Sequence, residues 1–502
     1  MIPLTLGRAP VSLPDLVEVA RVHRPVILDA ALRPRIDAGA AFLARLLAEG
    51  REVYGVNTGY GDSVTVAIPR EHLEALPLHL TRFHGVGSGR LLEPVEVRAV
   101  LLARLVSLAQ GASAVRWVVL EALAGLLRED LLPRIPAEGS VGASGDLTPL
   151  SYVAAVLVGE REVLRDGAPV PAATALAEAG LAPLILAPKE GLALMNGTAV
   201  MTALGALAWD RAHRLCTLGS RLTAFATAAL ESPRAHFHPR LFELKAHAGP
   251  RAVADRLWTD LSGADPDAAH RLQDRYSIRC APHVLGVLED ALGWIRRDLE
   301  AELNSANDNP LVDPEAELLL HGGHFYGGHV AFAMDALKTA VANVADLLDR
   351  QLALLVDPRY SEGLPPNLSG AEPHRTSLNH GLKAAQIAAS ACTAEALKLC
   401  MPASVFSRST ECHNQDKVSL GTIAARDALR VLELTEQVAA IHTLATVQAL
   451  RLRGPGAQAR LGVEARGALE RLAERLPFVQ EDQPLESVLR ALALDLKEGR
   501  PW

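Results

Sequence analysis

The chain has 502 residues and is 49% hydrophobic but only 4% aromatic, so Leu, Ala and Val must supply its core, which is typical of packed long helices. Its net charge of −8, with acidic and basic residues interspersed, argues against nucleic acid or an acidic membrane surface as a partner. Five scattered cysteines without a C-x-x-C pair, and a start that lacks a signal peptide, predict a reduced cytoplasmic protein with no structural zinc or other metal site.

Apolar residues recur at helical spacing over long stretches of the chain. These stretches cover 94–128, 149–158, 282–304, 330–356 and 418–453. The longest, of roughly 25–35 residues, would span about 40–50 Å at 1.5 Å rise per residue. Such lengths exceed those of the usual globular helix and suit a bundle that continues across subunits. Because strand-like alternation is scarce, the sequence predicts an all-α fold built on a long-helix bundle.

The sequence predicts two parts. Residues 1–190 form an N-terminal part, and residues 191–502 form the long-helix bundle and the C-terminal helices as one continuous structural unit. The longest uncharged stretch, 192–209, could be mistaken for a membrane span. It contains the polar residues Asn196 and Thr198, so we interpret it as a buried helix that is entered through a loop.

The segment GSVGASGDLTP at 139–149 contains the tripeptide Ala143-Ser144-Gly145. Because Gly145 has no Cβ, its amide nitrogen can be forced against the carbonyl carbon of Ala143. Loss of water from the resulting ring, and then of the Ser144 hydroxyl, would leave an exocyclic methylene on an imidazolone. The tripeptide could therefore make an electrophile of a kind that ordinary side chains do not offer.

The residues that follow the tripeptide predict the start of a helix. Thr148-Pro149 is typical of an N-cap followed by proline at the first helical position, and such a helix would direct its positive end at the loop. Two plainer interpretations exist. A flexible turn of small residues is the commoner explanation of such a tripeptide, and the glycines could form a phosphate loop. The phosphate loop is disfavoured because two prolines precede the segment and no lysine follows its last glycine.

Six short polar or glycine-rich loops lie between the predicted helices. Loops with Tyr, Arg, Asn, Gln and Glu on a rigid helical frame are common places for binding chemistry. Taken singly, each residue has a structural explanation, such as Asn196 as a cap, Arg279 in a surface ion pair or Tyr54 as a core residue. Together, and beside a self-reactive tripeptide, they indicate a functional site. The loops are YGVNTGYG (54–61), FHGVG (83–87), MNGT (195–198), QDRYSIR (273–279), HGGHF (321–325) and ECHNQD (411–416).

With these loops in this order, the chain resembles the aromatic amino acid ammonia-lyase family, which includes histidine, phenylalanine and tyrosine ammonia-lyases and related aminomutases. The resemblance covers nearly the whole length, and it implies a mostly helical homotetramer whose active sites draw loops from three subunits. It also implies a 4-methylidene-imidazol-5-one (MIO) group made autocatalytically from residues 143–145, with no external cofactor. Further matching motifs are GSVGASGDLTPL (139–150), GLALMNGT (191–198), QDRYSIRCAP (273–282), LNSANDNPL (303–311) and HNQD (413–416).

The resemblance also implies a role for individual residues. Tyr54 matches the general base that removes the β-proton of the substrate, and this task needs a depressed pKa. Arg279 matches the residue that pairs with the substrate carboxylate, for which a bidentate guanidinium is well shaped. By the same resemblance, the substrate amine and the MIO group are lined by Tyr276, Gln273 and Asn196, and Tyr276 is also catalytic. Phe325 is implied as a wall of the pocket, and Asp146 is implied to assist cyclisation.

The choice of substrate depends on Phe83-His84, the pair that faces the substrate ring in the family. A histidine at the second position matches histidine enzymes and some tyrosine enzymes. Lys383 and Glu411, which with Gln415 are expected to contact the substrate, resemble phenylalanine-lyase residues and disfavour histidine. Because His84 could hydrogen-bond a para hydroxyl, we expect L-tyrosine as the substrate and 4-coumarate as the product. The alternatives are histidine ammonia-lyase giving urocanate, then phenylalanine ammonia-lyase or a 2,3-aminomutase.

One position departs from the family pattern. His324 stands where the family usually has asparagine in GGNF, which affects the surroundings of Phe325 and not the fold. A different class of function is also open, because a catalytically silent helical scaffold could retain the same loops. A helical lyase of the fumarase type finds no support, since the chain has no match to its Gly-Ser-Ser loop.

Overall fold

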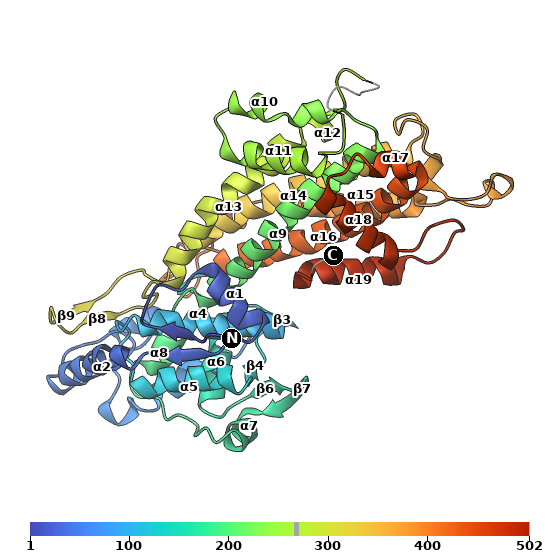
Figure 1. The fold of residues 1–502 in the computed structure, drawn as a ribbon. Helices are drawn as coiled ribbons and strands as arrows, with labels where there is room; N and C mark the ends of the chain where they lie inside the picture. The colour runs from blue at the N-terminus through green and yellow to red at the C-terminus, as the bar shows by residue number, and fades with distance from the viewer. Residues whose placement is uncertain (266–270, 501–502) are drawn as a thin grey trace. The chain divides into compact units, whose positions relative to one another are not determined.

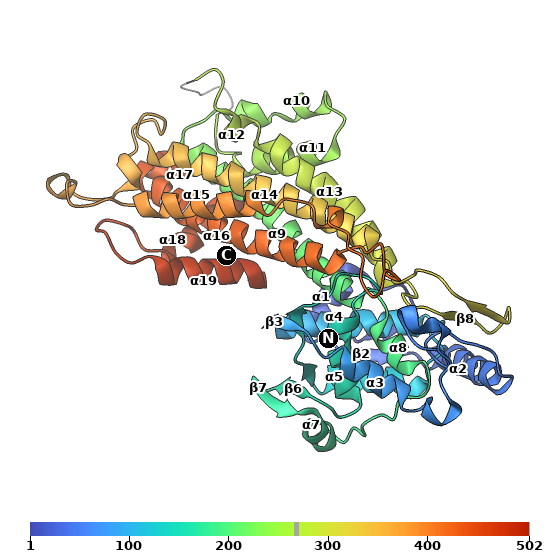
Figure 2. The same ribbon diagram turned by 180° about the vertical axis from the view of Figure 1, so that it is seen from behind.

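The computed structural model describes residues 1–265 and 271–500, which form two compact units (Figures 1 and 2). Four of the five boundaries between the units fall within long helices and the fifth follows Met401, so each unit combines three separate stretches of the chain. The expected division into residues 1–190 and 191–502 stays a prediction. Unit 1 comprises Met1–Asp210, Arg296–Asp335 and Pro402–Arg426, and unit 2 comprises Arg211–Ile295, Ala336–Met401 and Asp427–Trp502.

Unit 1 contains the short N-terminal helices and all the strands of the described chain. Its helices are α1 (Leu13–Arg21), α2 (Arg33–Ala48), α3 (Leu76–Phe83), α4 (Pro94–Ala109), α5 (Trp117–Arg128), α6 (Leu147–Leu157), α7 (Ala172–Glu178) and α8 (Glu190–Met195). Its strands are β1 (Leu4–Leu6), β2 (Val26–Leu28), β3 (Ser88–Leu91), β4 (Leu132–Pro133), β5 (Pro136–Glu138), β6 (Glu162–Arg165), β7 (Ala168–Pro171), β8 (Leu311–Asp313) and β9 (Leu318–Leu320).

The four helices that belong partly to each unit are the longest of the described chain. They are α9 (Ala199–Ala229), α13 (Ala281–Leu303), α14 (Gly328–Val356) and α16 (Gly421–Arg453). In unit 2, a Cβ on Gly219 of α9 would lie 3.0 Å from Leu285 of α13 and 3.6 Å from Val344 of α14, so these helices pack closely. The remaining helices of unit 2 are α10 (Pro239–Glu243), α11 (Ala248–Asp260), α12 (Tyr276–Arg279), α15 (Lys383–Lys398), α17 (Pro455–Gln458), α18 (Val463–Arg475) and α19 (Glu486–Glu498).

The predicted long helices at 282–304, 330–356 and 418–453 are confirmed as α13, α14 and α16. The stretch at 94–128 is instead two helices, α4 and α5. Between them Gly111 and Ala114 have positive φ angles of 79° and 56°, which an α-helix does not allow. The periodicity of the apolar residues does not reveal this break, although the turn-forming residues Gly111 and Ser113 are a local signal of it.

The sheets of the described residues are small. β1 and β2 pair in parallel, β3–β5 and β8–β9 are antiparallel pairs, and β4, β6 and β7 form an antiparallel three-stranded sheet. No strand of these sheets exceeds four residues. The predicted all-α class is therefore confirmed, and the sheets serve to fix loops between helices.

A hydrophobic cluster in unit 1 holds the YGVNTGYG loop. Val53 and Val56, on either side of Tyr54, are fully or almost fully buried against the apolar face of α2. Burial of a Val side chain stabilises by about 1.5–3 kcal/mol, so the two valines fix the backbone that carries Tyr54. The other buried members of the cluster are Phe42, Leu43, Leu46, Ala114 and Val312.

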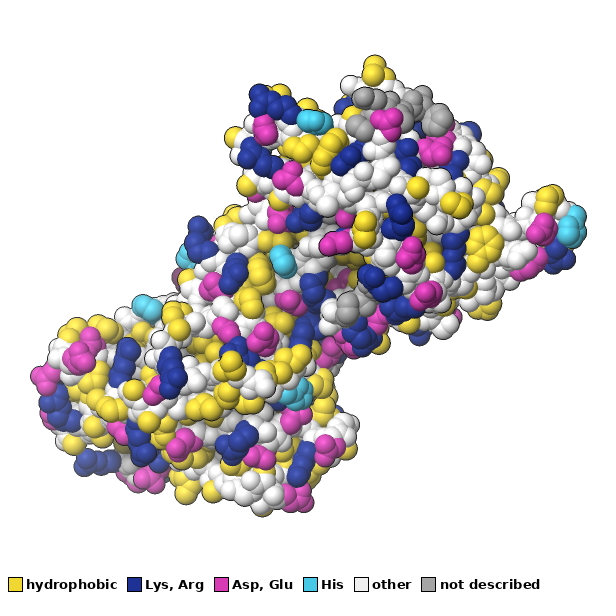
Figure 3. All heavy atoms as spheres, in the orientation of Figure 1, with side chains coloured by type: hydrophobic (Ala, Val, Ile, Leu, Met, Phe, Trp, Pro, Cys, Tyr) yellow, Lys and Arg dark blue, Asp and Glu magenta, His cyan; other side chains and the backbone are white. Residues whose placement is uncertain are grey.

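Charged side chains of both signs are intermixed on the face shown in Figure 3. This agrees with the interspersed Lys, Arg, Asp and Glu of the sequence. Within the described residues, no helix combines the length and the apolar character that crossing a membrane requires.

Candidate active site

The Ala143-Ser144-Gly145 tripeptide lies between β5 and the start of α6. The helix begins at Leu147 with Asp146 as its N-cap residue, so the prediction of Thr148 as the cap is wrong, and Pro149 is the third helical residue. The reason lies in tertiary contacts, because the Asp146 side chain bonds outside its own helix. The positive end of α6 nevertheless meets the tripeptide directly, as expected.

Asp146 connects the starts of two helices. Its Oδ2 accepts hydrogen bonds from the backbone N–H groups of Val200 (3.0 Å) and Met201 (2.9 Å), in the first turn of α9. Its Oδ1 accepts from Ser140 Oγ at 3.0 Å and from the Thr422 hydroxyl. Burial raises the pKa of the Asp146 carboxyl, although these hydrogen bonds oppose the shift. The residue expected to assist cyclisation is thus fully enclosed next to the tripeptide.

Gly197 holds the backbone on both sides of Gly145. The Asp146 N–H donates to the Gly197 carbonyl at 2.8 Å, and the Gly197 N–H donates to the Ser144 carbonyl at 3.3 Å. Gly145 has a φ of 69°, and a Cβ there would collide with the Gly197 carbonyl, so only glycine fits.

The amide nitrogen of Gly145, like those of Ala143 and Ser144, donates to no acceptor among the described residues, whereas the Gly142 and Asp146 N–H groups on either side of the tripeptide do. It is the atom that must attack the Ala143 carbonyl carbon to form an MIO group. A nitrogen without a hydrogen-bond acceptor, in a glycine whose flanking peptides are held, fits that cyclisation. The residues present therefore suit the prosthetic group.

Asn196 and Gln415 both contact Ser144. Asn196 Nδ2 donates to the Ser144 carbonyl at 3.3 Å, and Gln415 Nε2 donates to Ser144 Oγ at 3.1 Å. Asn196 is 3% exposed, and its buried Oδ1 has no hydrogen-bond partner among the described residues. A buried amide oxygen without a donor costs free energy, so this atom is ready to accept a hydrogen bond from a bound ligand.

Tyr54 is half-buried, and its hydroxyl oxygen accepts a hydrogen bond from the Gly61 N–H at 2.8 Å. The expectation of a depressed pKa is not met in the single chain. Burial raises the pKa of Tyr54, and the nearby Glu411 carboxylate adds to the shift, against the opposing effect of the Gly61 N–H. The phenol is the favoured form, and its conjugate base would be a strong one.

Glu411 joins the tyrosine loop to a second loop. Its two carboxylate oxygens accept from the Asp62 N–H at 2.9 and 3.1 Å. Residues 411–413 all have positive φ angles, a strained arrangement for residues other than glycine. The antiparallel bridge between Thr410 and Gln415 closes this turn and directs Gln415 at the tripeptide.

Phe83 and His84 end helix α3, with their ring centroids 4.2 Å apart. Phe83 is 56% exposed, whereas His84 is half-buried and its Nδ1 lies 3.1 Å from the Leu80 carbonyl oxygen. Burial lowers the pKa of His84, which favours the neutral ring. A neutral ring that donates its Nδ1–H to Leu80 presents Nε2 as a hydrogen-bond acceptor.

Phe325 is half-buried and His324 is exposed, in the turn between β9 and α14. Glu302 of α13 accepts from the Thr198 hydroxyl at 2.6 Å. Partial burial raises the pKa of Glu302, while His329 and His324 oppose the shift. His324, the departure from the family pattern, therefore lies within electrostatic range of a carboxylate.

The structure adds polar residues that sequence reasoning missed. Ser140 lies inside a motif that was singled out, so its proximity to the tripeptide was a usable signal. Thr422 and Glu302 carry no local pattern, because each reaches the site from a distant part of the chain.

Four predicted residues belong to unit 2, and they are described within that unit alone. Gln273, Tyr276 and Lys383 are exposed, with Tyr276 at 71%. Arg279 donates from Nε to the Asp274 carbonyl at 3.0 Å, and its guanidinium lies 4.7 Å from the Tyr276 ring centroid. The structure thus brings Tyr276 and Arg279 together within unit 2.

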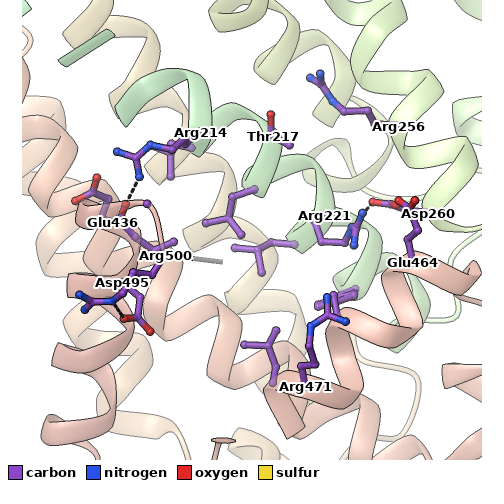
Figure 4. A pocket seen from close by; sticks show the side chains of 18 of the residues that line it. Arg214, Thr217, Arg221, Arg256, Asp260, Glu436, Glu464, Arg471, Asp495 and Arg500 are labelled. Atoms are coloured by element: carbon purple, nitrogen blue, oxygen red, sulfur yellow. Dashed lines mark hydrogen bonds and ion pairs between the residues drawn. The ribbon is translucent and has the colours of Figure 1, made fainter. Parts of the chain in front are cut away.

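Unit 2 also contains a cavity of about 640 Å³ that none of the predicted site residues lines (Figure 4). Its apolar part includes Leu215, Leu222 and Phe225. Its charged side chains include three ion pairs, which are Arg211–Glu436, Arg221–Asp260 and Arg500–Asp495. Figure 4 labels both partners of the Arg221–Asp260 and Arg500–Asp495 pairs. Volume alone therefore does not identify the chemical site.

Comparison with known proteins agrees with the geometry. The family described as aromatic amino acid lyase matches residues 11–474. Histidine ammonia-lyase of Sorangium cellulosum (strain So ce56) is 40% identical, covering 99% of this chain and 97% of the relative. Phenylalanine aminomutase of Pantoea agglomerans has a similar structure, with a TM-score of 0.93, 32% identity and 99% of both chains covered. Histidine ammonia-lyase from Trypanosoma cruzi has a TM-score of 0.90 and 31% identity, covering 99% of this chain and 94% of that chain. The protein is a carbon–nitrogen lyase that belongs to the aromatic amino acid lyase family.

Proposed function

We propose that this enzyme is a histidine ammonia-lyase, which eliminates ammonia from L-histidine to give urocanate. The observation that carries the chemistry is the tripeptide at 143–145, held on both sides while the Gly145 nitrogen has no acceptor. The names of the relatives support the substrate, because the Sorangium cellulosum and Trypanosoma cruzi proteins are both histidine ammonia-lyases. They do not support the L-tyrosine expected from the sequence.

The MIO group made from Ala143, Ser144 and Gly145 would supply an electrophilic methylidene carbon for the substrate amine. The chain surrounds that position with hydrogen-bond donors. Asn196 Nδ2 and the Gly197 N–H both donate to the Ser144 carbonyl oxygen. Preorganised donors of this kind stabilise negative charge that develops on an oxygen, and the positive end of α6 acts in the same direction.

Tyr54 is proposed to take the β-proton of the substrate onto its hydroxyl oxygen. The Gly61 N–H, which donates to that oxygen, stabilises the phenolate. Because burial raises the pKa of Tyr54, the phenolate is a minor form but a strong base once present. The unpartnered Oδ1 of Asn196 is suited to accept a hydrogen bond from the departing amine.

Arg279 is proposed to bind the substrate carboxylate, with Tyr276, Gln273 and Lys383 beside it. The exposure of Gln273, Tyr276 and Lys383 supports a site completed by other copies of the chain, in a homotetramer. In that arrangement Phe325, Glu411 and Gln415 contact the substrate from the tripeptide's own unit. The five cysteines without disulfides suit the reducing cytoplasm, which we propose as the location.

His84 is proposed to bind the substrate imidazole. Its Nε2 is an acceptor when Nδ1 donates to Leu80, so it can receive the N–H of a neutral imidazole. The same acceptor could receive a phenol O–H, and this is why the residue alone did not distinguish histidine from tyrosine.

The substrate assignment is tested by incubating the enzyme separately with L-histidine, L-tyrosine and L-phenylalanine and following the absorbance of each acrylate product. We expect urocanate to form with the highest kcat/KM. A preference for tyrosine, with 4-coumarate as the main product, would contradict the assignment.

A 2,3-aminomutase is the second candidate, because the Pantoea agglomerans structure that this chain resembles is named a phenylalanine aminomutase. The two reactions share their first half and differ in whether the amine is released or added at the β-carbon. Product analysis by chromatography separates them. Free ammonia in equal amount to the acrylate identifies the lyase, and a β-amino acid identifies the aminomutase.

A further inference from the structure

Arg104, near the end of α4, is a fully buried arginine behind the tripeptide. Its Nη1 donates to two backbone carbonyls, those of Asn196 at 3.0 Å and Asn307 at 3.2 Å. Its Nε and Nη2 have no hydrogen-bond partner in the part of the chain that the structure describes. Burying a guanidinium with incomplete hydrogen bonding is costly, so a structure that retains one needs a compensating reason.

The charge of Arg104 is maintained by buried carboxylates. Burial lowers the pKa of Arg104 to about 10, while Asp308 and Asp146 oppose the shift. Asp308 also pairs with the buried Lys189 ammonium. With a pKa near 10 the guanidinium stays protonated at neutral pH, so it acts as a fixed cation and donor and not as an acid.

Arg104 packs directly against Gly197. A Cβ on Gly197 would collide with Arg104 Nη1 and with the Asn307 carbonyl, so the peptide is confined between the two groups. Gly197 in turn accepts from the Asp146 N–H and donates to the Ser144 carbonyl. A continuous series of contacts therefore runs from Arg104 through the Asn196–Gly197 peptide to both sides of Gly145.

We propose that Arg104 is a positioning residue for the self-cyclisation of the tripeptide, an inference that rests on the proposed function. In that reaction the Gly145 nitrogen bonds to the Ala143 carbonyl carbon. The carbonyl oxygen leaves as water with the amide hydrogens of Ser144 and Gly145. The Ser144 hydroxyl then leaves as a second water with the hydrogen on its Cα. Arg104 contacts none of these atoms, and it fixes the peptide that holds them in place.

Arg98 provides a matched control on the same helix. It is 3% exposed, and it donates to the backbone carbonyls of Val19 at 3.1 Å and Leu127 at 3.2 Å. It also pairs with Asp130. Removal of Arg98 therefore disturbs a comparable buried arginine without touching Gly197.

The test compares Arg104→Gln, Arg104→Lys and Arg98→Gln with the wild type as full-length, soluble protein. Intact mass measures the fraction of chains that have lost two waters, and thermal unfolding measures stability. We expect the wild type and Arg98→Gln to lose both waters completely, although Arg98→Gln unfolds at a lower temperature. Most Arg104→Gln chains should retain both waters, and Arg104→Lys, which keeps one charged donor, should be intermediate.

Each result has a definite meaning. Complete loss of two waters in soluble Arg104→Gln would overturn the role of Arg104. If Arg104→Gln is insoluble, complete loss in Arg104→Lys at the same rate as in the wild type overturns it instead. A wild-type chain that keeps both waters would contradict the proposed function itself, so the two failures are distinguishable.

Discussion

The tripeptide region of unit 1 and the cavity of unit 2 both contain polar groups, and they differ in which of those groups are paired. Around the tripeptide, the Gly145 N–H and the Asn196 Oδ1 have no partner among the described residues, although the backbone beside them is held. In the cavity, Arg211 and Arg221 are already paired with acidic side chains. Because the cavity also contains an unsatisfied group, Arg256 Nε, neither volume nor an unpaired polar atom is enough, and it is the tripeptide held beside such groups that locates the chemistry.

Ser144→Ala should have the largest effect, because it removes the hydroxyl whose loss creates the methylidene. We expect a folded protein whose activity falls by several orders of magnitude. The mass should show at most one water lost, since the second water contains Ser144 Oγ. Steady-state kinetics and intact mass check these two expectations. Turnover near that of the wild type would mean that the tripeptide does not carry the reaction, so it would no longer differ from the cavity in this respect.

Tyr54→Phe keeps the ring and deletes the proposed base. A general base contributes roughly 10²–10⁴-fold, so kcat should fall within that range while the tripeptide still loses two waters. Thermal unfolding controls for stability, because the flanking valines that hold the loop are unchanged. A loss below about tenfold would mean that the base lies elsewhere.

His84→Leu tests the acceptor proposed for the substrate ring. An unsatisfied buried hydrogen-bonding group costs about 1–3 kcal/mol, which corresponds to roughly a tenfold to hundredfold change in a ratio of specificity constants. We expect kcat/KM for histidine to fall relative to that for phenylalanine by this factor. If the ratio changes by less than about twofold, His84 has a structural role only.

Glu411→Gln tests the electrostatic surroundings of Tyr54 through pH dependence. Because burial raises the pKa of Tyr54, the phenolate forms only on the alkaline side of neutral pH. We therefore expect kcat/KM to rise with pH there until Tyr54 is ionised. The Glu411 carboxylate adds to the raised pKa, so its neutral isostere should move that rise to lower pH. The quantity to compare is the pH at which kcat/KM reaches half its maximum, and not the maximal rate. If this pH is the same in Glu411→Gln and the wild type, Glu411 does not influence the ionisation of Tyr54.

Arg211→Leu should have the smallest effect on activity. It leaves Glu436 as a buried charge without its 2.7 Å partner, and such a loss costs about 3–5 kcal/mol of stability. The fraction of chains that have lost two waters should stay at the wild-type level. The kcat/KM per folded molecule should also be unchanged. Adding Glu436→Leu should restore much of the stability, because an apolar pair can replace a buried ion pair. A large fall in kcat/KM of the folded variant would show that the cavity takes part in the reaction.

The sequence predicts this molecule best where a local rule applies. Helices α13, α14 and α16 follow from periodicity, and the tripeptide follows from the chemistry of three adjacent residues. The Thr148 cap was wrong because Asp146 bonds to the first turn of α9, a contact that no local pattern specifies. Thr422 and Arg104 were missed for the same reason, since each is a single residue that tertiary packing brings to the loop.

The position of Asp146 between the starts of α6 and α9 has a consequence for the order of folding and cyclisation. The tripeptide is held only after both helix starts have met, so the proposed cyclisation would require a chain that has already folded there. The bonds of the prosthetic group are covalent and survive unfolding. If the proposed cyclisation takes place, a denatured sample would keep the prosthetic group, and it would need only to refold, without repeating the cyclisation, to become active again.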